Sequence, residues 1–133
     1  MINIKVKYGL KALIYLSNRG MHSITSAAQI SEELEIPKEF TSKILQSLTK
    51  YGYVESRKGK GGGFGLSQDP YEIKISDLFT SLGNSFDDQV CLFQINKSCK
   101  GENCRLCNEW NSFNEKFKAL IKEYTVGSFS CLL

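Results

Sequence analysis

One stretch of the sequence decides the fold, YVESRKGKGGGFGLS at residues 53–67. Residues 53–56 alternate as a β-strand with two different faces does, and residues 64–67 have the character of a returning strand. Residues 57–63 between them contain three cations and four glycines, none of which can contribute to a core. The pattern therefore predicts a β-hairpin with a positively charged, glycine-rich tip.

Two helices joined by a tight turn are predicted immediately before this hairpin. Ser26 and Gln29 have the spacing of a capping box, which predicts a short helix that ends at about Leu34. Pro37 suits the first turn of the next helix, because the N–H that proline lacks has no partner there. This second helix is predicted to close at residues 51–52. A helix-turn-helix followed directly by a hairpin is typical of a winged helix.

The remaining helices are predicted from apolar residues that recur at three- and four-residue spacings. They mark a first amphipathic helix over residues 4–18 and a short helix that begins at residue 76 or 77 and stops at Gly83. A last helix is predicted over residues 106–124, and its apolar stripe comprises Trp110, Phe113, Phe117, Leu120, Ile121 and Tyr124. The stripe suits either a core or a two-fold dimer interface, where one patch meets itself.

These elements predict a fold that is mainly α with a small β-hairpin. We expect a winged helix-turn-helix domain at residues 1–70 and a second region, with a long C-terminal helix, at residues 71–133. Charge follows the same division, because the first region has ten Lys and Arg against six Asp and Glu, and the second has seven against eight. The basic region suits a polyanion, although a merely solubilising surface has the same charge.

The hairpin tip has the chemistry of a DNA-binding wing. Glycines let the backbone approach a phosphate, and cations neutralise phosphates or enter a minor groove. The candidate cations are Arg57, Lys58 and Lys60. A nucleotide-binding loop is the alternative, but the tip lacks the P-loop spacing and joins two strands instead of opening a helix.

On the helix before the wing, polar residues near the N-terminus are candidates for contact with DNA, since such residues reach base edges from a recognition helix. Glu39, Ser42 and Lys43 are predicted to contact bases, and Lys38 and Thr41 to contact phosphates. All five lie off the apolar stripe of the predicted helix. The alternative is an ordinary solvated helix face.

The cysteines are clustered: four of the five fall within residues 91–107. They are Cys91, Cys99, Cys104 and Cys107. Without a secretory context, such clustering favours metal or redox chemistry over disulfides. Thiolates suit an iron–sulfur cluster, while four of them also suit zinc, and metal-free thiol sensing uses the same residues. Cys131, near the C-terminus, is predicted to have no role.

Motifs along nearly the whole chain resemble the Rrf2-type winged-helix transcriptional regulators, a superfamily that includes IscR, NsrR and CymR. They are YGLKAL at residues 8–13, ISEEL–IP at 30–37, Phe40, KIL at 43–45, residues 48–52, GGGFGL at 61–66, ISDL at 75–78 and the distal cysteines. The resemblance implies a homodimer on palindromic operator DNA, with the third helix in the major groove and the wing in the neighbouring minor groove. It also implies that the last helix pairs with its symmetry mate.

The same resemblance implies an iron–sulfur cluster held by three loop cysteines, which match Cys91, Cys99 and Cys104. Relatives take the fourth ligand from a histidine, whose place Cys107 occupies here, or from an acidic residue of the partner's first helix. Residues 1–20 contain no Asp, Glu, His or Cys, and Lys7 stands at the matching place. We therefore predict Cys107 as the fourth ligand, in a cluster of two or four irons.

The predicted function is a dimeric, sequence-specific DNA-binding repressor that senses redox state, nitric oxide or iron. The alternatives are a cluster-free regulator with a zinc or thiol-redox site and a protein–protein adaptor with a winged-helix fold. Residues 1–11 lack the apolar block of a signal peptide and no long apolar stretch follows, so we expect a cytoplasmic protein without membrane contact. His22 is the sole histidine and has no catalytic constellation around it, which argues against an enzyme.

Overall fold

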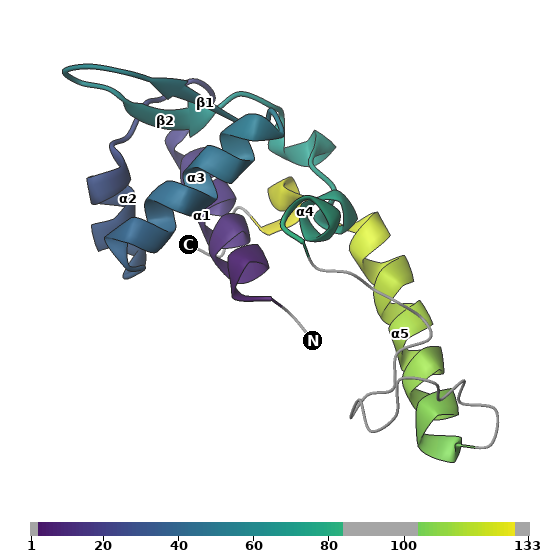
Figure 1. The fold of residues 1–133 in the computed structure, drawn as a ribbon. Helices are drawn as coiled ribbons and strands as arrows, with labels where there is room; N and C mark the ends of the chain where they lie inside the picture. The colour runs from purple at the N-terminus through teal and green to yellow at the C-terminus, as the bar shows by residue number, and fades with distance from the viewer. Residues whose placement is uncertain (1–2, 84–103, 130–133) are drawn as a thin grey trace.

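The computed structural model describes residues 3–83 and 104–129 (Figure 1). Helices α1 (Ile4–Arg19), α2 (Ala27–Leu34) and α3 (Lys38–Lys50) are followed by strands β1 (Val54–Arg57) and β2 (Gly63–Leu66). Then come the 3-10 turn η1 (Pro70–Glu72), α4 (Ile75–Ser81), the long α5 (Arg105–Glu123) and the 3-10 turn η2 (Val126–Phe129). The predicted class, mainly α with one hairpin, is confirmed.

The helix-turn-helix begins and turns where the sequence predicted. The Ser26 side chain accepts a hydrogen bond from the backbone N–H of Gln29 at 3.2 Å, which caps α2. Glu35, with a φ of 55°, adopts the left-handed conformation that turns the chain after α2. Pro37 takes the cap position, one residue before the predicted first turn, and its carbonyl accepts from the N–H of Thr41 at 2.9 Å.

The wing is an antiparallel pair in which Val54 faces Leu66 and Arg57 faces Gly63. A third segment joins it, since Thr25 and Phe64 exchange backbone hydrogen bonds of 2.9 and 2.8 Å. At Gly63 a Cβ atom would overlap the backbone of Thr25, so this glycine is required for the packing of the hairpin. The hairpin is therefore fixed to the loop before α2.

One continuous core holds the winged helix together. Its most deeply buried side chains come from α1, α2, α3, α4 and the hairpin, and include Leu13, Leu16, Ile30, Leu45, Leu48, Leu66 and Leu78. Each such burial contributes roughly 1.5–3 kcal/mol relative to exposure. At Gly9 of α1, a Cβ would come 2.5 Å from Leu82, so α1 and the end of α4 are in close contact. This packing fixes α3 and the wing on a rigid base.

The end of the chain returns to this core after α5. The backbone N–H of Val126 donates to the carbonyl of Ile73 at 2.9 Å, and the N–H of Ile75 donates to the carbonyl of Tyr124 at 3.0 Å. In Figure 1 the C-terminal end of α5 lies beside α4, while its N-terminal end extends away from the other helices. Residues on both sides of residue 70 belong to the same core. The division of the chain into a DNA-binding region and a second region at that residue therefore remains a prediction.

Candidate nucleic-acid interface and cysteine site

Helix α3 has one face in the core and one face toward solvent. Ile44, Leu45 and Leu48 are buried on the inner side. The outer side carries most of the predicted DNA contacts: Lys38, Glu39 and Lys43 are exposed and Ser42 is half-buried. Four of the five side chains that the sequence singled out on this helix can therefore reach a ligand in solution.

Thr41 is the exception, and the expectation that it lies off the apolar face is wrong. Its side chain is 2% exposed. The hydroxyl donates to the carbonyl of Pro37 at 3.1 Å, which satisfies it within the first turn of α3. Threonine can pack as a small apolar residue once its hydroxyl is bonded to its own helix. We therefore leave Thr41 out of the side chains proposed to contact DNA.

A groove runs beside the outer face of α3 and has a volume of about 630 Å³. It is lined by Lys5, Pro37, Glu39, Phe40, Lys43, Ile44, Gln46, Ser47 and Lys50. Sequence reasoning missed two of its cations as members of the site. Lys50 lies seven residues after Lys43, so a helical wheel of α3 would have found it. Lys5 comes from α1, and only the tertiary packing brings it to α3.

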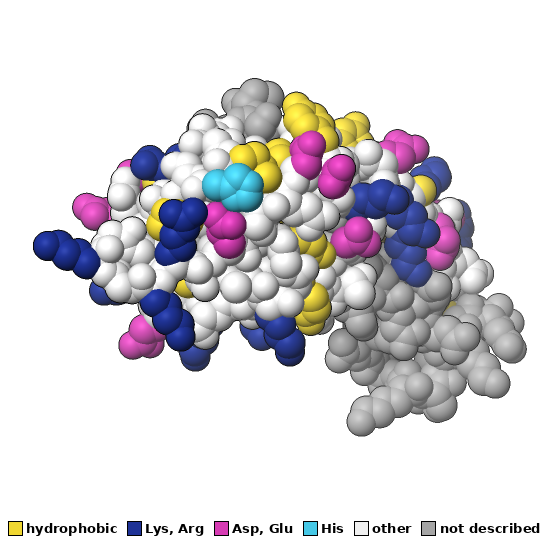
Figure 2. All heavy atoms as spheres, turned by 90° about the horizontal axis from the view of Figure 1, so that it is seen from above, with side chains coloured by type: hydrophobic (Ala, Val, Ile, Leu, Met, Phe, Trp, Pro, Cys, Tyr) yellow, Lys and Arg dark blue, Asp and Glu magenta, His cyan; other side chains and the backbone are white. Residues whose placement is uncertain are grey.

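The wing carries its three predicted cations in the open. Arg57, Lys58 and Lys60 are all exposed. Figure 2 shows the molecule from above, and dark blue Lys and Arg side chains stand at its left-hand projection, where the hairpin tip lies. A solvated cation at a hairpin tip is suited to phosphates, because neutralising a phosphate releases the counterions condensed on the DNA.

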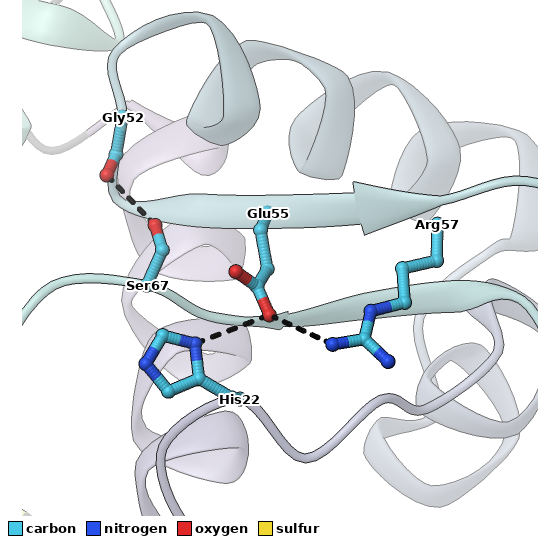
Figure 3. A network of polar contacts seen from close by, with 5 residues as sticks. All are labelled: His22, Gly52, Glu55, Arg57 and Ser67. Carbon is cyan, nitrogen blue, oxygen red and sulfur yellow. Dashed lines mark hydrogen bonds and ion pairs between the residues drawn. The ribbon is translucent and has the colours of Figure 1, made fainter.

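An acidic residue, Glu55, sits at the base of these cations and was not anticipated. One of its carboxylate oxygens lies 3.2 Å from Nδ1 of His22 and 4.0 Å from the Arg57 guanidinium (Figure 3). His22 is in the loop before α2, as predicted. Exposed ion pairs of this kind contribute roughly 0–1 kcal/mol, so these contacts add little to the stability of the fold.

The base of the wing is also tied to its neighbours by hydroxyl groups. The Ser67 hydroxyl donates to the carbonyl of Gly52 at 2.9 Å, across the open end of the hairpin (Figure 3). The hydroxyls of Tyr53 and Ser81 are 2.9 Å apart and join the start of β1 to α4. The wing is thus connected both to α3 and to the helix that packs on α5.

Two of the four candidate metal ligands fall within the described residues. Cys104 is the cap residue of α5 and is half-buried, and Cys107, in the first turn, is 7% exposed. Cys91 and Cys99 lie outside the described residues, as does Cys131. Within residues 3–83 and 104–129, no three His, Cys, Asp or Glu side chains are grouped as a metal would require.

The environment of these two cysteines suits thiolate chemistry. They lie at the N-terminus of a long helix, whose dipole favours negative charge, and the first turn contains no acidic residue. Cys107 is buried without belonging to the main core, so apolar packing in that core does not account for its burial. The donor set fits one half of a four-thiolate site.

The predicted apolar stripe of α5 is exposed along much of its length. Phe113, Leu120 and Tyr124 are 45–49% exposed, and Trp110 and Phe117 are half-buried between them. Leu106, which the predicted stripe did not include, extends it by one turn and is 49% exposed. These six residues follow one another at spacings of four and three in strict alternation, as in the seam of a paired helix. Ile121, which the sequence placed on the same stripe, is buried in the core instead.

The sequence matches the model of the Rrf2 family, described as iron-dependent transcriptional regulators, over residues 2–130. The chain belongs to the Rrf2 family. The resemblance seen in its motifs is thereby confirmed.

Individual relatives agree with this assignment. A helix-turn-helix-type transcriptional regulator of Aquifex aeolicus is 32% identical over 92% of this chain and 83% of its own. The regulator NsrR of Bacillus subtilis is 31% identical over 90% of this chain and 82% of its own. The structure of CymR, the global cysteine regulator of B. subtilis, superposes with a TM-score of 0.78 at 20% identity, covering 100% of this chain and 98% of CymR. This last match shows that the fold is shared.

This Rrf2-family chain is therefore a DNA-binding transcription regulator with a winged-helix fold, and not an enzyme. In the part of the chain that the structure describes, no helix has both the length and the apolar character needed to cross a bilayer.

Proposed function

We propose that this Rrf2-family regulator binds a palindromic operator as a homodimer, with α3 in the major groove and the wing at the adjacent minor groove. The observation that carries the proposal is the outer face of α3, which is polar and exposed while its inner face is anchored in the core. A hairpin with three exposed cations follows it directly. A rigid helix presents base-reading groups in fixed positions, and a cationic hairpin adds the affinity for phosphates.

The chemistry of the side chains divides them into those suited to contact bases and those suited to contact phosphates. Glu39 accepts hydrogen bonds and suits the amino group of cytosine, while Lys43 suits the acceptor edge of guanine. Ser42 accepts or donates with any base. Lys38, Arg57, Lys58 and Lys60 contact phosphates, which fix the register without reading sequence.

Two lysine variants separate these roles. We expect Lys58→Gln to weaken binding to all duplexes uniformly, and Lys43→Gln to change which sequences are preferred, at a cost of about 1–3 kcal/mol at one base position. The measurement is fluorescence anisotropy against a duplex selected from a random library and against its single-base variants, over a range of salt concentrations. Lys122→Gln, on the last turn of α5, is the matched control and should behave as the wild type.

The proposal fails if the purified protein, in every form obtained, binds no duplex in a salt-sensitive way. Binding whose affinity did not change with salt concentration would equally exclude phosphate contacts, because counterion release makes the affinity fall as the salt concentration rises. Binding to a protein partner alone would favour the adaptor alternative.

For the sensing part, we propose that Cys91, Cys99, Cys104 and Cys107 hold an iron–sulfur cluster. Support comes from the position of Cys104 and Cys107 one helical turn apart at the positive end of α5, and from the family's description as iron-dependent. A bound cluster would supply iron whose state responds to redox conditions, nitric oxide or iron supply. Cys104 and Cys107 would connect that response to α5, the helix that also carries the apolar stripe.

Anaerobic purification tests this site. We expect coloured protein with visible absorption and with iron and sulfide in stoichiometric amounts, and we expect Cys107→Ser to lose most of both. Cys131→Ser is the control and should keep the wild-type content. Colourless protein with stoichiometric zinc would replace the cluster by a zinc site. A normal cluster in Cys107→Ser would remove only this residue from the ligand set.

A further inference from the structure

The groove beside α3 brings together cations from two helices that are far apart in the sequence. Lys43 and Lys50 come from α3 and Lys5 from the first turn of α1, and all three line the same groove of about 630 Å³. Glu39 is the only acidic residue among its lining residues. The groove thus has a net positive charge along a helix face that is proposed to lie against DNA.

The position of Lys5 has no explanation in the stability of its own helix. The N-terminus of a helix is its positive end, where acidic residues are favourable and cations are not. The first turn of α1 contains no acidic residue, and Lys5 is exposed there. Lys50 differs, since it lies in the last turn of α3, where a cation complements the dipole. An anion bound near Lys5 would turn an unfavourable arrangement into a favourable one.

The placement of this groove matches the shape of DNA. In Figure 1, α3 lies between the wing above it and the first turn of α1 below it. A helix in a major groove has a sugar-phosphate ridge on each side, because the groove is bounded by both strands. The wing would contact the ridge on one side of α3. The ridge on the other side would face the groove that Lys5 lines.

We propose that Lys5, together with Lys50 from the same groove, binds the phosphate ridge on the side of α3 opposite the wing. This rests on the proposed function and adds a second anchor to it, so that α3 is held from both sides of the major groove. Glu39 repels phosphate and therefore restricts the contact to the lysines. The ligand class is the phosphodiester backbone of duplex DNA, without preference for sequence.

The test is the salt dependence of binding, because each phosphate contact adds to its slope. The probe is a fluorescein-labelled duplex of mixed sequence, about 30 base pairs long, titrated with full-length protein by anisotropy at several salt concentrations. We expect Lys5→Gln to lower the slope of log affinity against log salt by about one, and to weaken binding about threefold to tenfold at moderate salt.

A structural role for Lys5 predicts a different result. Removing a cation from the positive end of α1 should leave the thermal midpoint unchanged or raise it, so the loss of binding would not come from unfolding. Lys11→Gln is the matched control on the same helix. Lys11 lies about 120° around α1 from Lys5 and donates to the carbonyl of Leu34 at 3.4 Å, and its variant should keep the wild-type slope.

Two outcomes overturn the inference: an unchanged slope in Lys5→Gln, or an equal loss in Lys11→Gln. If Lys43→Gln and Lys58→Gln lose affinity while Lys5→Gln keeps its slope, the second anchor is wrong and the proposed function stands. If the wild type itself shows no salt-sensitive binding, the proposed function fails and the second anchor with it.

Discussion

Gly63 is the residue at which the wing touches the loop before α2. Thr25 pairs with the neighbouring Phe64 there, so the backbone of Thr25 fills the space that a side chain at position 63 would need. Position 65 has a similar constraint, because a Cβ on Gly65 would come 2.8 Å from the carbonyl oxygen of Ser23. The absence of a Cβ atom at positions 63 and 65 therefore allows the wing to pack against the loop before α2.

We expect Gly63→Ala to lower the free energy of unfolding by about 1–3 kcal/mol, the usual cost of forcing a methyl group into an occupied space. Thermal or urea unfolding would measure it. Gly59→Asn is the control, because position 59 has open space around it and asparagine tolerates the left-handed backbone found there. An unfolding midpoint of Gly63→Ala equal to that of the wild type would contradict the steric argument.

At the same scale, the sequence predicted the exposure of most candidate side chains, but it did not predict their tertiary contacts. The exposed positions of Lys38, Lys43 and the wing cations follow from local periodicity and from the turn. The burial of Thr41 does not, because a threonine is equally compatible with either side of a helix until its hydroxyl partner is known. Glu55 was missed for a related reason: its contacts with His22 and Arg57 require the hairpin to be folded against a distant loop.

At the scale of elements, α5 combines two functions on separate faces. Ile121 anchors it in the core, while Phe113 and its neighbours at four- and three-residue spacings are open to solvent. Phe79 of α4 packs edge-on against Phe117, with ring centroids 5.8 Å apart, so the stripe continues onto the body of the protein. A stripe of this length is larger than the scattered apolar residues of an ordinary surface.

We expect Phe113→Glu to convert the proposed dimer into a monomer, since it would place two charges in the centre of the proposed self-complementary apolar contact. The fold of each subunit should persist because Phe113 is half exposed already. Analytical ultracentrifugation measures the mass, and Lys116→Glu, one turn away and off the stripe, is the control for added negative charge. A Phe113→Glu protein that stays dimeric would place the interface elsewhere.

At the scale of the whole molecule, the order of the elements could be predicted and their mutual packing could not. The helix-turn-helix, the hairpin and the last helix each have a local signal in capping, glycine content or periodicity. The return of η2 to Ile73 has no such signal, because it depends on a backbone hydrogen bond between Val126 and Ile73, which lie more than fifty positions apart. The approach of Lys5 to α3 is of the same kind, which is why that side of the candidate interface was visible only in the folded chain.

The two ends of α5 have different contacts, so a displacement of its N-terminal end would rotate the helix about its C-terminal end. Its C-terminal end is fastened by the bonds from Ile75 to Tyr124 and from Val126 to Ile73, whereas its cysteine end stands away from the other helices. Nineteen helical residues span about 28 Å, so a displacement of about 1 Å at Cys104 corresponds to a rotation of only about 2° at the fulcrum. A change at the proposed cysteine site would therefore reach α4, Ser81 and the wing as a small rotation, and in the proposed dimer both subunits would undergo it.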